Sequence, residues 1–348
     1  MDILPIGLLI AVLFGIKIIR PLANINKDYL SIDTSKCYRG LFAIVVVFHH
    51  LALQTQTGIA FRYFASIGHL AVAYFFFLSG YGLQKSYMIK GDVYRKDFLA
   101  KRLPVIIIPY IIVTTLYWIT YAIGGNFYSF KDVILAIVNG WPIVSYSWYI
   151  INIFVFYIAF YFFMCICRKH YFYMLICACA WYFLYVLFCV KMEYGSWWYI
   201  STQVLIVGMF WAIYENKILN ILRRNIFIIP SIWILFIALF IFQCKISSFN
   251  NGINLILYFV ITIVFSLSIV LFSMKFQIGN VILNFLGDIS LEIYLIQGLF
   301  IAGLRNSTIY ISNDLLYAIL VVAFSIILGY ILHFIFNAII SKYRNILK

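Results

Sequence analysis

Long apolar runs constrain this chain more than any other feature of its sequence. Eleven such runs follow one another with short connections between them. A helix of about 17–25 apolar residues is long enough to cross a lipid bilayer. The sequence therefore predicts an all-α, polytopic membrane bundle of about eleven transmembrane helices. The runs fall near residues 3–19, 38–54, 64–84, 103–124, 146–167, 171–190, 196–214, 226–243, 253–273, 286–304 and 315–338.

The scarcity of charge excludes a water-soluble fold. Only 10% of the residues are charged and 66% are hydrophobic, whereas soluble domains carry about 25% charged residues. A net charge of +14 would suggest a nucleic-acid partner in a soluble protein. In a membrane protein, an excess of Lys and Arg marks the cytoplasmic loops. We therefore expect the lipid bilayer as a partner and no nucleic acid.

The distribution of Lys and Arg predicts the orientation. With the N-terminus outside, only five of the 25 basic residues fall in external segments, namely Arg62, Lys131, Lys191, Lys245 and Arg305. The others fall in internal segments, which include Lys17 and Arg20 after the first run and Lys348 at the chain end. The positive-inside rule thus favours an N-outside, C-inside topology.

The first run differs from the rest. Its basic residues follow the apolar stretch, whereas a cleavable signal peptide carries them in front. We therefore predict an additional N-terminal anchor helix and linker over residues 1–35 and one helical membrane domain over residues 36–348. Seven cysteines lie mostly in apolar runs without acidic neighbours, so we expect small buried side chains and neither a metal site nor a disulfide framework.

Ionisable side chains inside the predicted spans are functional candidates, because each is costly in a bilayer unless it is paired or hydrated. Arg39 and His50 lie eleven positions apart, about three helical turns plus roughly 20°, so they share one helix face about 16 Å apart. His49 points about 100° away. Imidazole is the usual general base near neutral pH, and the spaced arginine favours this role for His50 over that of a structural histidine bonded to a neighbouring helix.

Two carboxylates stand four positions apart in "GDISLEIYLIQ". Asp288 lies near the inner interface, where a helix N-terminus favours a carboxylate. Glu292 lies deeper and needs a partner from another helix, such as a His or an Arg. A carboxylate that orients an imidazole is a recurrent catalytic device, so Glu292 is either a catalytic partner or half of a structural ion pair. His333 is expected near the inner interface, and His69 could line an outer cavity.

Five segments in order resemble the acyltransferase-3 family of membrane acyltransferases, which modify bacterial surface glycans. "RGLFAIVVVFHH" is similar to the R-x10-H opening of the family, which places that motif on Arg39 and His50. The others are "GHLAVAYFFFLSGYGL", with Phe75, Phe76, Ser79 and Gly80; "FLAKRLPVIIIPY", with Arg102 and Pro109; "SWYII", with Trp148 and Tyr149; and "LGDISLEIYLIQ". Three positions depart from the family pattern: Ala73 replaces an acidic residue or proline, Val105 a second arginine, and Gln297 a late histidine.

The resemblance implies an O-acyltransferase of the bacterial cell membrane. Acyl-CoA, with acetyl-CoA the first choice, would be a cytoplasmic co-substrate, with no permanently bound cofactor. The acceptor would be a hydroxyl of a glycan or lipid-linked sugar. Arg39 and Arg102 would bind phosphates of the donor, and His50 would act as general base or relay the acyl group. Ser79, Tyr149, Tyr294 and Gln297 are candidates for contacts with substrate or oxyanion.

Two other functions fit a bundle with buried ionisable groups. Transporters and flippases also place such groups near the bilayer midplane, but they commonly show paired repeats with broken helices, and no internal duplication is visible in this chain. A non-catalytic assembly factor or sensor is the third alternative. Turnover of acetyl-CoA distinguishes an enzyme from both.

Overall fold

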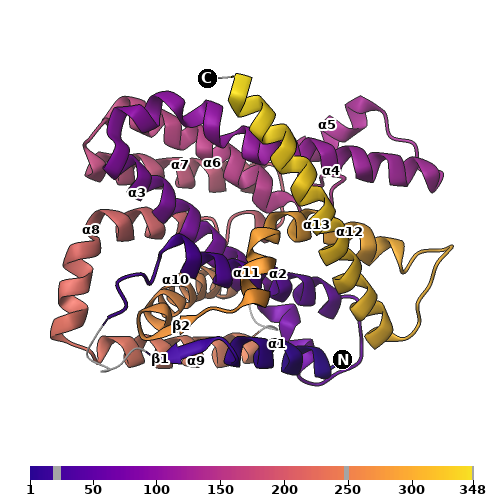
Figure 1. The fold of residues 1–348 in the computed structure, drawn as a ribbon, viewed down its shortest axis with the longest axis horizontal. Helices are drawn as coiled ribbons and strands as arrows, with labels where there is room; N and C mark the ends of the chain where they lie inside the picture. Colours follow the sequence, from indigo (N-terminus) through magenta and orange to yellow (C-terminus); the bar gives the residue numbers. More distant parts are fainter. Residues whose placement is uncertain (19–24, 247–250, 347–348) are drawn as a thin grey trace.

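A computed structural model describes residues 1–18, 25–246 and 251–346. Arg20 and Lys348, which entered the predicted topology, lie outside the described residues. The helices are α1 (Ile3–Leu13), α2 (Ile32–Ala52), α3 (Gly68–Arg102), α4 (Pro104–Ile123), α5 (Phe130–Val138), α6 (Trp148–Cys167), α7 (Tyr171–Lys191), α8 (Val204–Arg224), α9 (Ile228–Ile246), α10 (Asn251–Lys275), α11 (Val281–Asp288), α12 (Ser290–Gly303) and α13 (Asp314–Ile346). Figure 1 shows α4, α6 and α7 along one side of the bundle and α1 and α9 along the other, with α2, α10 and α12 between them.

The all-α membrane fold is confirmed, and fewer helices than predicted runs meet the length and hydropathy expected of a spanning helix. Among the described residues, seven helices are long and apolar enough to cross a membrane, or eight if α11 and α12 form one bent span. The 11 residues of α1 rise only about 16 Å, roughly half the hydrocarbon thickness. The charged and histidine residues of α2 lower its hydropathy. The predicted runs at 64–84 and 103–124 fall in two consecutive helices, α3 and α4, which are separated by Leu103 alone.

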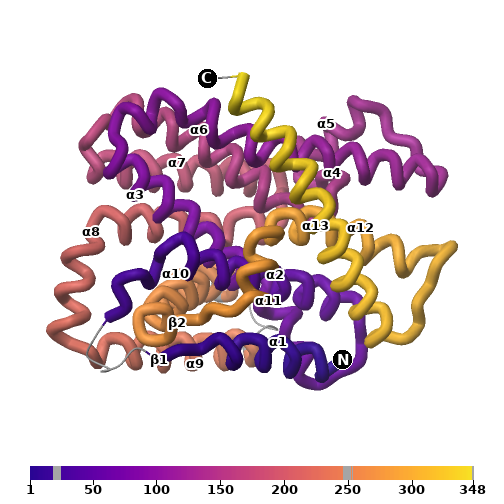
Figure 2. Tube along the Cα trace, in the orientation of Figure 1, coloured from indigo at the N-terminus to yellow at the C-terminus, as the bar shows by residue number. Residues whose placement is uncertain are grey.

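The first helix nevertheless joins the two ends of the bundle. At one end, the Asp2 carboxylate accepts hydrogen bonds from the backbone N–H groups of Ile59 and Phe61 at 3.0 and 2.9 Å. At the other end, β1 (Ile16–Ile18) pairs antiparallel with β2 (Phe276–Ile278). The short helix α1 and the strand β1 that follows it together extend from one end of the bundle to the other. Figure 2 shows the N-terminus and the end of α13 far apart on the molecule.

The basic segment 85–102, which follows the predicted run at 64–84, is the continuation of α3. This helix has 35 residues, and it contains a non-helical break at Gly91 with φ 55° and ψ −134°. A positive φ is readily adopted only by glycine. Beyond the break, Tyr94 and Phe98 are buried. The segment is helical because these rings pack onto the core, which a polar loop would leave exposed.

Close backbone contacts at glycines fix the position of α2 and α3. A Cβ atom at Gly80 would lie 1.9 Å from the Leu205 carbonyl oxygen of α8, and one at Gly287 would lie 2.1 Å from the Lys36 carbonyl oxygen of α2. Small residues at such crossings allow membrane helices to pack backbone to backbone. The same glycines occur in the segments that resemble the family, so part of that pattern serves packing.

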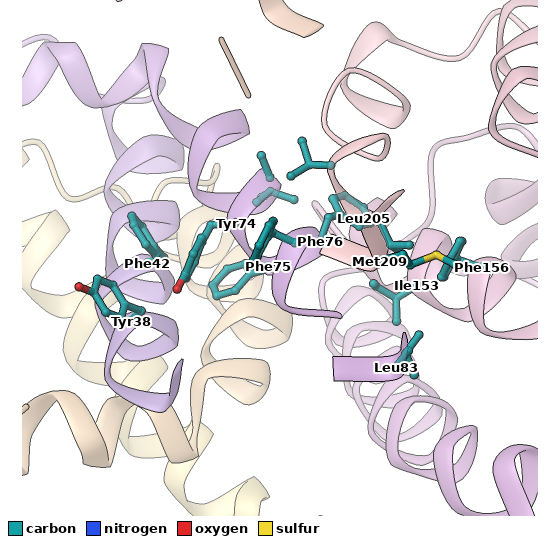
Figure 3. Close-up of a cluster of buried hydrophobic side chains, with 14 of the residues drawn as sticks. Tyr38, Phe42, Tyr74, Phe75, Phe76, Leu83, Ile153, Phe156, Leu205 and Met209 are labelled. Atoms are coloured by element: carbon teal, nitrogen blue, oxygen red, sulfur yellow. The ribbon is translucent and has the colours of Figure 1, made fainter. Parts of the chain in front are cut away.

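An aromatic core fills the space between α2, α3 and their neighbours. Phe42 and Tyr74 have ring centroids 5.2 Å apart, and Tyr38 lies 5.8 Å from Tyr74. Figure 3 shows these rings in a buried cluster that continues through Phe75 and Phe76. Because Tyr38 is adjacent to Arg39 in the sequence, this packing holds the backbone that carries the arginine.

Candidate active site

Two cavities flank α2, one near each of its ends, and they meet at one residue. We call the cavity of about 650 Å³ beside Arg39 the inner cavity and the cavity of about 620 Å³ beside His50 the outer cavity. Tyr294 of α12 lines both. Molecules bound in the two cavities would therefore approach one another at Tyr294.

The inner cavity contains the two arginines predicted to bind the donor, together with Ser79 and Tyr149. Nε of Arg39 is buried and has no hydrogen-bond partner among the described residues. The guanidinium of Arg102 lies over the ring of Tyr94, 5.8 Å from its centroid. In the described part of the chain neither arginine forms a salt bridge. Both side chains are partly buried, and a partly buried cation without a carboxylate is costly, so this cavity is suited to an anion.

A second polar cluster borders the inner cavity and has no signal in the sequence. The Glu215 carboxylate accepts hydrogen bonds from Tyr29 at 2.5 Å and Tyr81 at 3.0 Å, and it pairs with Lys85 at 2.5 Å. The indole N–H of Trp211 donates to the Tyr29 hydroxyl at 2.9 Å. Burial, followed by the neighbouring carboxylate, raises the pKa of Tyr29, so the phenol remains a donor. The cluster fastens the segment before α2 to α3 and α8.

Three of the six basic residues between positions 85 and 102 pair with carboxylates. Besides Lys85, Arg95 pairs with Asp92 at 3.0 Å and Lys101 pairs with Asp97 at 2.6 Å. Arg102 remains on the wall of the inner cavity. Fewer basic residues are therefore available to bind an anion than the sequence of this segment indicates.

His50 lies at the junction of the outer cavity with α12. Its Nδ1 lies 3.3 Å from Oε1 of Gln297, and Nε2 of Gln297 donates to the Tyr294 carbonyl at 3.2 Å. The second bond fixes which end of the amide faces the histidine. Oε1 is an acceptor only, so Nδ1 of His50 carries the proton and Nε2 keeps its lone pair. No hydrogen bond occupies that Nε2 in the described residues.

A strained tyrosine covers the His50 ring. The rings of His50 and Tyr146 stack with centroids 3.7 Å apart and planes at 15°. Tyr146 has φ 66°, a left-handed conformation that costs a non-glycine residue about 1–3 kcal/mol. The Tyr294 hydroxyl donates to the Tyr146 carbonyl. Tyr294, which lines both cavities, thus holds Tyr146 in place against the His50 ring.

His49 also lines the outer cavity, although the helical spacing predicts that it faces elsewhere. Its ring centroid lies 5.0 Å from that of His50. Its Nδ1 donates to the Phe64 carbonyl at 3.0 Å. A Cβ atom at Gly68 would lie 2.2 Å from the ring, so the glycine makes room for it. The cavity wraps around the end of α2 and is reached from both faces, which helical spacing alone does not reveal.

Comparison with known families decides the class of the protein. A family model described as an acyltransferase domain, of the acyltransferase-3 family, matches residues 32–334. The chain belongs to this family. It is therefore a multi-pass membrane acyltransferase, and the transporter and assembly-factor alternatives are set aside. No curated protein and no solved structure gives a significant match to the chain.

The three departures from the family pattern have clear positions in this acyltransferase. Ala73 and Val105 both pack in the hydrophobic core, Ala73 fully buried and Val105 partly buried. Neither supplies a polar group. Gln297, expected as a contact for substrate or oxyanion, instead accepts from Nδ1 of His50. The amide oxygen offers one fixed acceptor, whereas a histidine at this position could present either a donor or an acceptor.

Glu292 of the acyltransferase does not contact His50. Its carboxylate pairs with Nδ1 of His333 at 2.9 Å, and Asn337 lies 2.9 Å from the other ring nitrogen. The catalytic role expected for Glu292 as the orienting partner of His50 therefore has no geometric support. Asp288 pairs with Lys36 at 2.6 Å. Both carboxylates join helices, α12 to α13 and α11 to α2.

The described residues contain no group of three His, Cys, Asp or Glu side chains close enough to hold a metal ion. Three histidines do line the outer cavity, namely His49, His50 and His69. Sequence reasoning singled out only the second of them for chemistry. The local sequence signal for the other two is Gly68, which precedes His69 and whose missing side chain leaves space for the His49 ring.

Proposed function

We propose that this acyltransferase moves an acyl group, most simply acetyl, from acyl-CoA in the inner cavity to a hydroxyl group of a glycan or lipid-linked sugar in the outer cavity. Acyl-CoA is made in the cytoplasm, so the inner cavity would face that side of a bacterial cell membrane. The observation that carries the proposal is the pair of cavities. One offers unpaired guanidinium groups, the other offers an imidazole with a free lone pair, and they share Tyr294.

The donor end of the proposal rests on charge. Arg39 and Arg102 would bind phosphate groups of CoA, because guanidinium forms strong, charge-assisted bonds with phosphate oxygens. The pantetheine arm of CoA is long, flexible and uncharged, so it would extend along the inner cavity towards Tyr294. That direction would bring the thioester to the side of the wall opposite His50.

The chemistry would use Nε2 of His50 as general base. The acceptor oxygen attacks the thioester carbonyl carbon while Nε2 takes the hydroxyl proton. The carbon–sulfur bond of the tetrahedral intermediate then breaks, and the departing thiolate takes the proton from the imidazolium. The products are an ester and free CoA. Tyr294, Tyr149 and Ser79 remain the candidates to donate a hydrogen bond to the oxyanion.

The acceptor end rests on the lining of the outer cavity. Aromatic rings form much of its wall, including Trp141, Trp148, Trp197 and Tyr258. Trp and Tyr combine a large apolar face with a polar atom, which suits the mixed apolar and hydroxylated faces of a sugar. Trp141 and Trp197 contact each other edge to face at 5.5 Å and are exposed.

The experiment is acyl transfer by the purified protein in detergent. Radiolabelled acetyl-CoA is supplied with cell-envelope polysaccharide from cells that lack the protein. We expect label to appear in base-labile esters on the polysaccharide. Retention of all label on CoA, with neither transfer nor hydrolysis, would contradict the proposed acetyl-CoA donor. Repeating the assay with succinyl-CoA distinguishes a different acyl group from a different donor class.

A further inference from the structure

His69 is a polar side chain of the outer cavity that the mechanism above leaves unused. It is the second residue of α3 and contributes to the cavity wall. Its backbone carbonyl accepts from the Ser201 hydroxyl at 2.9 Å. Its ring meets the ring of Tyr258 edge to face, with centroids 4.9 Å apart at 88°. The position of the ring is therefore fixed by neighbours on α10 and on the segment before α8.

The ring nitrogens of His69 differ from those of His49 and His50 in their hydrogen bonding. His49 donates from Nδ1 to a backbone carbonyl, and His50 donates from Nδ1 to Gln297. Nε2 of His69 is buried without a hydrogen bond, and neither ring nitrogen has one among the described residues. Leaving the ring nitrogens of a partly buried imidazole unpaired costs free energy. Nδ1 is not among the fully buried unpaired atoms, so a ligand hydroxyl in the cavity would bond to Nδ1 and reduce that cost.

We propose that His69 binds the acceptor sugar, through a hydroxyl other than the one that is acylated. This inference rests on the proposed function and adds the residue that chooses the site of modification. A sugar presents several hydroxyls of similar reactivity, so a single base does not select one of them. A second contact from a fixed side chain on α3, opposite His50 on α2, would turn one hydroxyl towards Nε2 of His50.

A contact between His69 and the acceptor should affect acyl transfer to the sugar but not hydrolysis of acetyl-CoA. Water can replace the sugar as acceptor, and its reaction needs the donor site and His50 but no contact with His69. We therefore expect His69→Ala to lower transfer to the polysaccharide by about three- to tenfold, the range of one hydrogen bond. Hydrolysis of acetyl-CoA without polysaccharide should remain within about twofold of that of the unaltered protein.

The test measures both reactions with the purified full-length protein, radiolabelled acetyl-CoA and cell-envelope polysaccharide as the probe. His69→Gln, which keeps a donor and an acceptor, should recover part of the transfer rate. His69→Phe, which keeps a ring against Tyr258 but no nitrogen, should not. His170→Ala is the matched control, because His170 is exposed at the turn between α6 and α7. NMR of the product should show ester at additional positions for His69→Ala.

Three outcomes would overturn the assignment. The first is unchanged transfer and unchanged ester position in His69→Ala. The second is an equal loss of transfer and hydrolysis in variants that elute as monodisperse protein in detergent. The third is recovery by His69→Phe but not by His69→Gln, since that pattern indicates a packing role. Absence of acetyl-CoA turnover by the unaltered protein would instead overturn the proposed function, and this inference with it.

Discussion

The inner and outer cavities have similar volumes but opposite chemistry. Three basic residues line the inner cavity, and Glu215 neutralises one of them, Lys85. The other two, Arg39 and Arg102, form no salt bridge with any described residue. Among the described residues, the outer cavity is lined by imidazole and aromatic rings and by no arginine or carboxylate. We therefore expect charge to select what enters the inner cavity, and the outer cavity to provide a group that accepts a proton.

The largest effect should come from removing the base. His50→Ala should lower the acyl-transfer rate by about 10²–10⁴-fold, the usual contribution of a positioned general base. His49→Ala is the matched control, because His49 lines the same cavity but is held by the Phe64 carbonyl. Initial rates at saturating acetyl-CoA and matched protein levels measure both. If His49→Ala is the more impaired variant, the base has been assigned to the wrong histidine.

Weakening the other cavity should change affinity for the donor. Arg39→Ala and Arg102→Ala should each raise KM for acetyl-CoA by about tenfold to a hundredfold, since a hydrogen bond to a charged group contributes about 1.5–3 kcal/mol. Lys101→Ala is the control, because that lysine is exposed and paired with Asp97. Dephospho-CoA thioesters sharpen the test, because they lack the 3′-phosphate. If one of the arginines contacts that phosphate, its alanine variant and the unaltered protein should have similar KM values for a dephospho-CoA thioester. An unchanged KM for acetyl-CoA in both arginine variants would contradict binding of the donor in the inner cavity.

The tautomer of His50 offers a smaller and more specific test. Gln297→Leu removes the acceptor for the Nδ1 proton and leaves the cavity shape similar. We expect a loss of about two- to tenfold in the transfer rate, which matches one neutral hydrogen bond. Donor affinity should stay unchanged, because Gln297 does not line the inner cavity. An effect on KM for acetyl-CoA alone would show that the amide serves the donor.

The smallest effect is expected at Glu292. Glu292→Gln keeps an acceptor for His333 and touches neither cavity, so the transfer rate should change by less than about twofold, with at most about 1 kcal/mol lost in stability. Thermal unfolding in detergent and the same rate assay check this pair of expectations. A hundredfold loss of rate without loss of stability would restore the carboxylate to the catalytic site.

The general architecture could be predicted from the sequence because bilayer burial demands long apolar helices. The position of Arg39 and His50 could also be predicted, since both lie on one regular helix. The breaks within helices could not be predicted, because hydropathy does not reveal that α11 and α12 bend by 74° at one residue or that α3 continues through Gly91.

The partners of buried polar groups were the weakest part of the prediction. Glu292 needed a His or Arg, and the sequence contains several of similar chemistry. Only packing of α12 against α13 selects His333 over His50. Glu215 and Tyr29 are 186 positions apart, and no periodic pattern connects them. The left-handed backbone of Tyr146 is likewise invisible in the sequence, because a tyrosine gives no local signal for a positive φ.

Equilibrium binding of acetyl-CoA tests the separation of the two cavities most directly. The measurement compares the unaltered protein, Arg39→Ala and His50→Ala in the same detergent, with radiolabelled donor and no acceptor. If the inner cavity holds the donor and the outer cavity performs proton transfer, Arg39→Ala should lose about tenfold to a hundredfold in affinity, and His50→Ala should bind as the unaltered protein does. Normal binding by Arg39→Ala together with lost binding by His50→Ala would contradict that division of roles.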